Sequence, residues 1–274
     1  MLSVERLQKT YSTGGKPLEV LRDVSFTVKE GEFVTVVGPS GAGKTTLLRC
    51  MAGLLPPSGG KVTLTDTGRV IDSPPKEIAC VFQDYSRSLM PWYKVSRNVA
   101  LPLANTIKDR DERRQAVEQA LQSVGLDGFG DSYPWQLSGG MQQRVAIARA
   151  LAYRPEFLIM DEPFASVDAQ TRADLEDLIL RVRQSAGVTI VLVTHDIDEA
   201  VYLADRVVVV SNRPTVVMDV IDIDLPHPRS QVTTKGLPRF GELRTKVAKL
   251  ITQASADAAA AQAEAAAAQA EAKA

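Results

Sequence analysis

The chain has 274 residues, of which 45% are hydrophobic, and it carries 32 Lys and Arg against 33 Asp and Glu. This length suffices for one α/β domain with a substantial core, or for one domain with an additional lobe. A net charge of −1 gives no basic footprint, so nucleic-acid binding is not expected. No apolar run is long enough to span a bilayer, so we expect any membrane connection to come from another chain.

Two cysteines, Cys50 and Cys80, lie in apolar surroundings without metal-like spacing. They favour a reduced, cytosolic setting.

Residues 2–36 have strand character. Within them, residues 24–28 (VSFTV) alternate between apolar and polar types, which predicts a half-buried strand. A turn at residues 29–32 (KEGE) leads into the apolar run 33–37 (FVTVV), which predicts a fully buried strand.

A glycine-rich loop follows this strand and precedes a predicted helix at residues 46–52. The loop fits the pattern G-x-x-x-x-G-K-[ST] of a phosphate-binding loop and consists of Gly38, Pro39, Ser40, Gly41, Ala42, Gly43, Lys44, Thr45 and Thr46. Glycines let successive backbone N–H groups converge on one anion, and the helix N-terminus adds partial positive charge. Lys44 is expected to reach the terminal phosphates, and the Thr45 hydroxyl to bind Mg²⁺. The loop predicts a nucleoside triphosphate site.

The middle of the chain alternates between predicted strands and helices. A buried strand is predicted at residues 78–82, ending at Gln83, and residues 84 to about 152 are mainly helical, with amphipathic helices at 109–124 and 138–151. The later elements are strands at 157–160, 188–193 and 207–210 and a helix at 169–184. This order predicts a mostly parallel sheet.

The last part of the chain, residues 254–274, is composed almost only of Ala, Gln, Glu, Asp, Ser and Lys. Alanine favours helix, but no apolar stripe is large enough to pack against a core. We expect a solvated helix or a disordered tail, separate from a domain at residues 1–253.

Two adjacent acids, Asp161 and Glu162, end the apolar run Phe157-Leu158-Ile159-Met160. A buried strand that ends in carboxylates places them at the edge of the sheet where ligands bind in open α/β folds. Asp161 is predicted to hold Mg²⁺ through water, and Glu162 to polarise the water that attacks the γ-phosphate. Taken alone, the two acids could equally mark the start of a loop.

The stretch Leu137-Ser138-Gly139-Gly140-Met141-Gln142-Gln143-Arg144 begins the predicted helix at 138–151. Alone, Ser138 could be an ordinary helix N-cap followed by two glycines in a turn. Between a phosphate loop and an acidic strand end, the stretch resembles the signature sequence of ATP-binding-cassette (ABC) ATPases. The resemblance covers roughly residues 1–251. It implies a P-loop NTPase core with a mostly parallel sheet, an N-terminal antiparallel β subdomain and a helical subdomain at about residues 84–152.

The resemblance implies roles for four further residues. Tyr11 is similar to the aromatic residue that stacks on adenine, and Gln83 to the glutamine that contacts Mg²⁺ and the attacking water. His195 resembles the switch histidine that hydrogen-bonds the γ-phosphate. Asp168, in Ala165-Ser166-Val167-Asp168, resembles the loop that communicates across the dimer, although Val167 stands where the family more often has leucine. By their sequence alone, the four could also be a surface tyrosine, a polar strand end, a structural histidine and a helix N-cap.

In this family the signature residues Ser138, Gly139 and Gly140 complete the site of a second subunit, which implies a head-to-tail homodimer that binds two ATP molecules. The stretch at residues 84–99, with Met90-Pro91-Trp92 and Asn98-Val99, resembles importer ATPases for nitrate, sulfonate and taurine. Arg213-Pro214 and residues 225–229 resemble the same subgroup.

The importer resemblance implies ATP hydrolysis that powers uptake of a small solute, an anion such as nitrate, sulfonate or taurine. It further implies a permease that docks near Gln83 to Trp92, a substrate-binding protein as an indirect partner, and a peripheral position at the cytoplasmic face of the membrane. A charge at Leu89 or Trp92 is then expected to uncouple transport. The alternative for Met90-Pro91-Trp92 is a hydrophobic plug within the helical subdomain.

Other classes of P-loop protein explain less of the sequence. A GTPase is disfavoured because no Asn-Lys-x-Asp motif occurs, and a small-molecule kinase would not need the stretch at Ser138 to Gly140. A soluble, non-transport ABC ATPase, for example in iron–sulfur assembly, stays open as the alternative.

Overall fold

The computed structural model describes residues 1–84, 88–165 and 167–271. The chain forms two compact units, and each joins segments that are far apart in the sequence. Unit 1 comprises Met1–Val28, Val34–Ser73 and Val193–Ala274, and unit 2 comprises Lys29–Phe33 and Pro74–Leu192.

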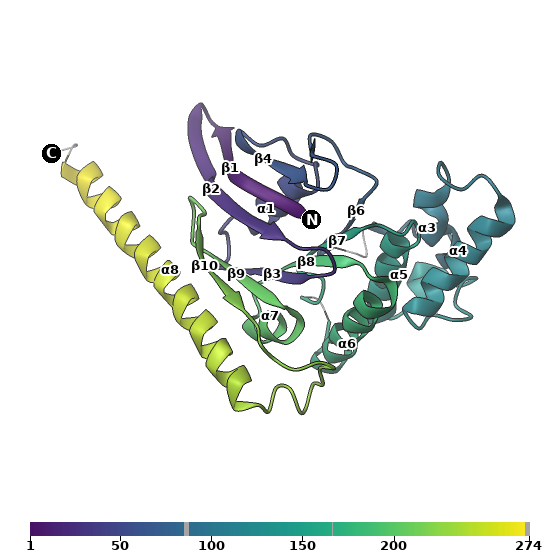
Figure 1. The fold of residues 1–274 in the computed structure, drawn as a ribbon. Helices are drawn as coiled ribbons and strands as arrows, with labels where there is room; N and C mark the ends of the chain where they lie inside the picture. Colours follow the sequence, from purple (N-terminus) through teal and green to yellow (C-terminus); the bar gives the residue numbers. More distant parts are fainter. Residues whose placement is uncertain (85–87, 166, 272–274) are drawn as a thin grey trace. The chain divides into compact units, whose positions relative to one another are not determined.

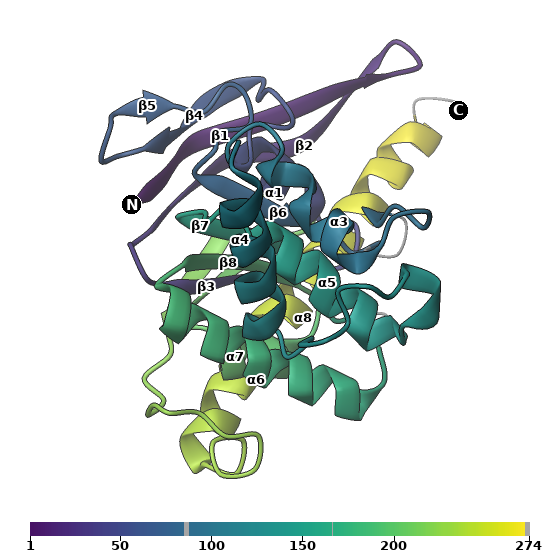
Figure 2. The ribbon, with the colours of Figure 1, turned by 90° about the vertical axis from the view of Figure 1, so that its right-hand side faces the viewer.

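Unit 1 contains an antiparallel sheet with the strand order β2-β1-β4-β5 (Figure 2). Its strands are β1 (Leu2–Thr13), β2 (Lys16–Val28), β4 (Gly59–Leu64) and β5 (Arg69–Val70). In β2, Val24, Phe26 and Val28 are buried and alternate with the more exposed Ser25 and Thr27, so one face of the sheet packs on a core. The predicted N-terminal antiparallel β subdomain is confirmed.

The rest of unit 1 contains β3 (Phe33–Val37), which leads into the phosphate loop, together with two further strands and three helices. Strand β9 (Arg206–Val210) pairs in parallel with β3 and antiparallel with β10 (Val217–Asp222). The helices are α1 (Lys44–Met51), α7 (Ile197–Leu203) and α8 (Pro238–Glu271). Helix α8 packs against α7 and β9 and forms an ion pair from Lys246 to Asp219 on β10, 3.0 Å long (Figure 1).

The alanine-rich segment continues α8 rather than forming a separate element, because the helix runs without a break to Glu271. Ala254 is buried, and residues 255–257, 259 and 260 are exposed. Up to residue 260, the segment is therefore a largely solvated extension of a packed helix.

Unit 2 contains neighbouring strands in the order β8-β7-β6, which are β8 (Thr189–Thr194, its last two residues in unit 1), β7 (Phe157–Asp161) and β6 (Ile78–Val81). Strands β6 and β7 are parallel. Every residue of β7 and β8 is buried, as expected for parallel strands covered on both faces, which explains their continuous apolar sequences. The predicted α/β class with a mostly parallel sheet is confirmed.

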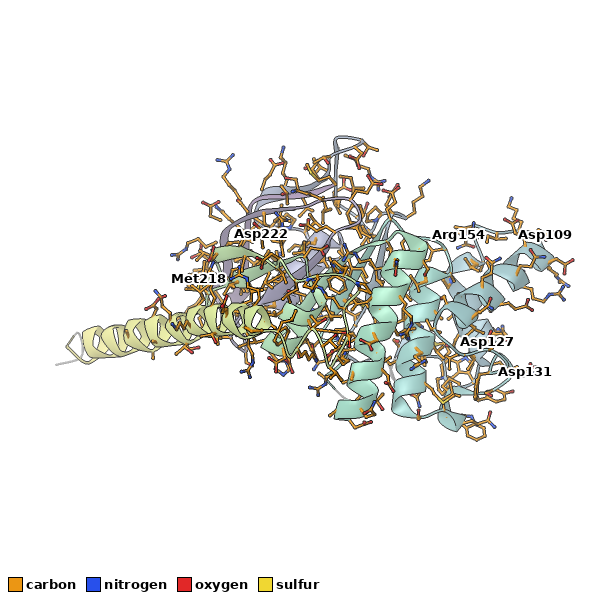
Figure 3. The ribbon with its side chains drawn as sticks, turned by 60° about the horizontal axis from the view of Figure 1, so that its bottom comes forward. Asp109, Asp127, Asp131, Arg154, Met218 and Asp222 are labelled. Atoms are coloured by element: carbon orange, nitrogen blue, oxygen red, sulfur yellow. The ribbon has the colours of Figure 1, made fainter. Side chains whose placement is uncertain are left out.

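The helical elements of unit 2 are α3 (Val95–Ala100), η1 (Leu101–Leu103), α4 (Arg110–Ser123), η2 (Pro134–Gln136), α5 (Gly139–Leu151) and α6 (Ala169–Ala186). Helices α3, α4 and α5 contact one another (Figure 2). The carboxylate of Asp109 caps α4 by accepting hydrogen bonds from the N–H groups of Asp111 and Glu112 at 2.9 and 2.8 Å. Figure 3 shows Asp109 at one end of α4, and Asp127 and Asp131 on the loop beyond its other end.

Candidate functional site

The predicted site residues fall into two groups, one in each unit, and each group is built by its own local contacts. Unit 1 carries Tyr11, the phosphate loop and His195. Unit 2 carries Gln83, the acid pair, the signature residues and Asp168.

The phosphate loop connects β3 to α1. Gly43 is the N-cap of α1, with a φ angle of 94° and no side-chain capping bond. A Cβ atom at this position would lie 2.6 Å from Val20 Cγ1, so both the backbone angle and the packing require glycine. Because no side chain caps α1, its first N–H groups keep the partial positive charge that attracts an anion.

Lys44 is held inside this loop. Its side chain is buried, and Nζ donates hydrogen bonds to the carbonyl oxygens of Gly38 at 2.8 Å and Pro39 at 3.0 Å. These bonds compensate for the burial of the ammonium group. Thr45 follows in the first turn of α1 and is half-buried. The loop therefore combines a fixed cation and a hydroxyl group at one helix N-terminus.

Tyr11 lies on β1, and the structure brings it to the start of α1. Its hydroxyl group is 3.4 Å from the Thr46 hydroxyl group, and Lys9 Nζ lies 5.4 Å from the centre of its ring. The ring is half-buried. An aromatic side chain thus lies beside the phosphate loop, as a base-stacking role requires.

His195 is exposed and directly follows the end of β8. The backbone on either side of it is fixed. The Thr194 hydroxyl group donates to Glu199 Oε2 at 2.6 Å and accepts from the N–H of Asp196 at 3.0 Å. The Asp196 carboxylate then caps α7. This network holds the imidazole at the surface of unit 1.

In unit 2 the acid pair ends β7. Asp161 is 5% exposed, and Glu162 is half-buried with a φ angle of 45°. That left-handed conformation costs a non-glycine residue about 1–2 kcal/mol. Gln83 Nε2 donates to Glu162 Oε2 across 3.5 Å, so the two residues predicted to handle the attacking water lie together.

The signature residues begin α5 and touch the start of α6. Ser138 caps α5 by accepting a hydrogen bond from the N–H of Met141 at 3.3 Å. A Cβ atom on Gly140 would lie only 2.4 Å from Cγ2 of Thr171 on α6. Close approach of the two helices therefore requires glycine at position 140.

Asp168 is the N-cap of α6, as its alternative interpretation predicted. Its carboxylate accepts hydrogen bonds from the Thr171 N–H at 3.0 Å and from the Thr171 hydroxyl group at 2.6 Å. The bonds from Thr171 hold the pKa of Asp168 below its usual value. Thr171, which the sequence analysis did not single out, therefore connects Asp168 to the signature glycine Gly140. Ser166 of the same predicted loop lies outside the described residues.

The segment predicted to face a permease divides into a buried and an exposed part. Leu89 is 2% exposed, whereas Trp92 is 67% exposed. The prediction for Leu89 needs correction, because a charge at this buried position would destabilise unit 2 rather than test docking. The plug interpretation of Met90-Pro91-Trp92 does not fit, because Pro91 and Trp92 are exposed. Tyr85, Ser86 and Arg87 lie outside the described residues.

Two side chains fix this segment in place. Asn98 on α3 is fully buried; its Oδ1 accepts from the N–H of Met90 at 2.8 Å, and its Nδ2 donates to the carbonyls of Met90, Tyr93 and Lys94 at 3.0–3.2 Å. Arg149 on α5 donates to the carbonyl and hydroxyl oxygens of Ser88 at 2.6 and 2.7 Å. The turn that presents Trp92 is thus tied to both α3 and α5.

The oxygen donors predicted for Mg²⁺ are chemically suitable. Thr45, Gln83 and Asp161 offer a hydroxyl, an amide and a buried carboxylate oxygen, the donor types that Mg²⁺ prefers. Within the described part of the chain, no group of three or more His, Cys, Asp and Glu side chains could hold a metal ion by itself. Mg²⁺ bound through a single carboxylate together with substrate phosphates needs no such group. None of the described helices has the length and apolar character needed to cross a membrane.

The α/β fold and the phosphate loop define the class of protein, a P-loop nucleotide-binding protein. The family model described as ABC transporter matches residues 21–165 of the chain. The chain belongs to the ABC transporter family, and it is an ATP-binding cassette of that family.

Individual relatives agree with this assignment. The chain is 42% identical over 248 residues to the aliphatic sulfonates import ATP-binding protein SsuB of Bacillus licheniformis, covering 90% of this chain and 93% of that protein. It is also 42% identical over 256 residues to the nitrate import ATP-binding protein NrtC of Synechococcus elongatus, covering 92% of this chain but 38% of that longer protein. The predicted resemblance to nitrate and sulfonate importer ATPases is confirmed, and these names favour it over the non-transport alternative.

A solved structure supports the same cassette fold. It is the dimeric, post-hydrolysis state of the ATP-binding cassette MJ0796 bound to ADP and Pi, which aligns with a TM-score of 0.71 and 33% identity. The alignment covers 81% of this chain and 99% of that chain.

Proposed function

We propose that the chain binds and hydrolyses ATP as the ATPase subunit of an ABC importer. The observation that carries the proposal is the phosphate loop of unit 1, with Lys44 buried inside it, in a member of the ABC transporter family. Lys44 binds the terminal phosphates, Tyr11 stacks on the adenine, and His195 hydrogen-bonds the γ-phosphate. The similarity to a cassette bound to ADP and Pi supports this assignment.

In the same proposal, unit 2 supplies the group that activates water. The carboxylate of Glu162 accepts a proton from the attacking water, and Gln83, whose amide faces Oε2 of that carboxylate, orients it. Thr45, Asp161 and Gln83 would hold Mg²⁺, which when bound supplies positive charge to the phosphate oxygens. The predicted oxygen donors fit this role.

A second copy of the chain completes the proposed site. Ser138, Gly139, Gly140 and Asp168 act on the ATP held by the other copy, in a head-to-tail homodimer. The dimeric state of the related cassette MJ0796 supports this arrangement.

The proposed partners lie in and beyond the membrane. The chain would lie at the cytoplasmic face, bound to permease subunits, while a separate substrate-binding protein delivers the solute. The solute proposed is a small anion such as nitrate, a sulfonate or taurine, because relatives are named for nitrate and aliphatic sulfonate import.

Trp92 is the proposed anchor for the permease. Its ring is 67% exposed and stands on a turn held by Asn98. A rigid exposed tryptophan suits a docking surface, since little conformational entropy is lost on binding. Because Arg149 joins the same segment to α5, displacement of the turn would be transmitted to the helix that begins with the signature residues.

Nucleotide chemistry is tested with two variants of the full chain. Lys44→Ala should lose ATP affinity, and Glu162→Gln should bind ATP but turn it over at least about a hundredfold more slowly, the scale of a lost general base. Size-exclusion chromatography with light scattering should show an ATP-dependent dimer for Glu162→Gln. A monomer that still binds ATP would contradict the dimer, and ATP affinity unchanged by Lys44→Ala would contradict the site itself.

Docking is tested with a matched pair of exposed tryptophans. Trp92→Glu should abolish permease-stimulated ATP hydrolysis and transport while leaving basal hydrolysis intact. The control is Trp135→Glu, because Trp135 is similarly exposed, at 70%, but lies on η2. Equal effects of the two substitutions, or loss of basal hydrolysis in Trp92→Glu alone, would contradict docking at Trp92.

A further inference from the structure

Residues 211–215 follow β9 and lie against the phosphate loop within unit 1; we name this segment the strap. Two of its side chains donate hydrogen bonds to successive carbonyl groups of the loop. Arg213 Nε donates to the carbonyl oxygen of Gly41, and the Thr215 hydroxyl group donates to the carbonyl oxygen of Ala42. Thr215 is fully buried, and Arg213 is exposed.

These two bonds fix the orientation of two peptide planes. In a trans peptide the C=O and N–H groups point in opposite directions, so a carbonyl held by the strap turns the following N–H away from it. The bond from Arg213 fixes the plane whose N–H belongs to Ala42, and this N–H donates to the carbonyl of Pro39 at 3.2 Å, closing the turn of the loop. The bond from Thr215 fixes the plane whose N–H belongs to Gly43, at the start of α1.

The strap is itself anchored on both sides. The N–H of Thr215 donates to the carbonyl of Val20 at 2.9 Å, and the carbonyl of Thr215 accepts from the N–H of Arg22 at 2.9 Å. Asn212 Nδ2 donates to the carbonyl of Ala254 on α8 at 3.4 Å. The strap therefore joins β2 and α8 to the loop, and it can resist movement of the loop's peptide groups.

We propose that Arg213 and Thr215 are positioning residues for the triphosphate. Thr215 holds the peptide group that presents the Gly43 N–H to phosphate oxygens, whereas Arg213 holds the turn closed by the Ala42 N–H and adds positive charge beside the loop. The inference rests on the proposed function, because the ligand is the triphosphate. A loop without these bonds has to order its peptide groups when the nucleotide binds, which weakens affinity.

The test separates the hydroxyl group of Thr215 from its packing. Thr215→Val keeps the shape but removes the donor, and Thr215→Ser keeps the donor but removes the methyl group. We expect the Kd for Mg-ATP, measured by titration calorimetry on the full chain, to rise about tenfold in Thr215→Val, as for loss of one buried hydrogen bond, and to stay within about twofold in Thr215→Ser. A residue with only a packing role would give the reverse order.

Arg213→Ala provides a second variant, because Arg213 is exposed and its removal leaves the core intact. It should also weaken ATP binding several-fold, whereas Arg69→Ala, which removes another exposed arginine of unit 1, should not. Parental ATP affinity in both Thr215→Val and Arg213→Ala would overturn the strap's role while leaving the proposed function intact. Absence of ATP binding in the parent chain would overturn the proposed function and the strap together.

Discussion

Substitution of Gly140 by alanine tests the contact between the signature residues and α6. Both Gly140 and Gly241 lie near the start of a helix, in α5 and α8 respectively. Replacing glycine by alanine in a helix normally stabilises it by up to about 1 kcal/mol. Helix propensity alone therefore predicts that both substitutions increase stability.

Packing reverses this expectation at Gly140. The new Cβ atom would lie 2.4 Å from Thr171 Cγ2, whereas carbon atoms normally make contact at about 3.5–4.0 Å. Overpacking of this kind costs about 1–3 kcal/mol, which exceeds the gain in helix propensity. We therefore expect Gly140→Ala to lower the free energy of unfolding by about 1–2 kcal/mol. At Gly241, a Cβ atom would meet no atom within 4 Å apart from those of its chain neighbours and its own helix backbone. Gly241→Ala should therefore raise the free energy of unfolding.

Thr171→Ser should rescue Gly140→Ala. It removes the methyl group that obstructs the new Cβ atom and keeps the hydroxyl group that binds Asp168. Urea denaturation of the two single variants and the double variant gives the coupling energy directly. ATP hydrolysis by the same proteins shows whether the contact also matters for turnover. If Gly140→Ala is as stable as the parent, or if Thr171→Ser leaves its loss of stability unchanged, the steric argument is wrong.

Two more predictions concern buried groups of unit 2 and α1. Asn98→Ala removes the hydrogen bond that Asn98 accepts from Met90 and those that its amide shares among three carbonyl oxygens. Urea denaturation should therefore show a loss of about 3 kcal/mol, against less than about 1 kcal/mol for the neighbouring exposed Arg97→Ala. A similar small loss in both variants would refute the role of Asn98. Burial raises the pKa of the Cys50 thiol to about 11 and that of Cys80 to about 12, so a thiol reagent at pH 8 should label neither in the native chain and both in urea. Rapid labelling of the native chain would contradict the burial of Cys50 and the partial burial of Cys80.

The structural features that the sequence predicts well are those determined by neighbouring residues in the chain. The buried strands at 33–37 and 157–160, the phosphate loop and the caps at Ser138 and Asp168 each depend on local patterns of apolar, glycine or capping residues. Strand β10 was missed, because its two aspartates interrupt the apolar pattern and its conformation depends on pairing with β9.

The missed site residues depend on contacts between distant parts of the chain. Thr215 binds a carbonyl group 173 positions away, and a threonine carries no local sign of such a partner. The sequence also predicted the same docking role for Leu89 and Trp92, since both are apolar residues in one stretch. Only packing distinguishes them, because it buries the first and exposes the second.

The backbone angle of Glu162 implies a compromise between the stability of the fold and the presence of a carboxylate at this position. With φ at 45°, this position would accept glycine more comfortably than any residue with a side chain. Selection for thermal stability alone would therefore favour glycine at position 162 and eliminate the carboxylate. Glycine would remove the carboxylate that we propose as the general base, so the strained backbone is a cost of the proposed chemistry.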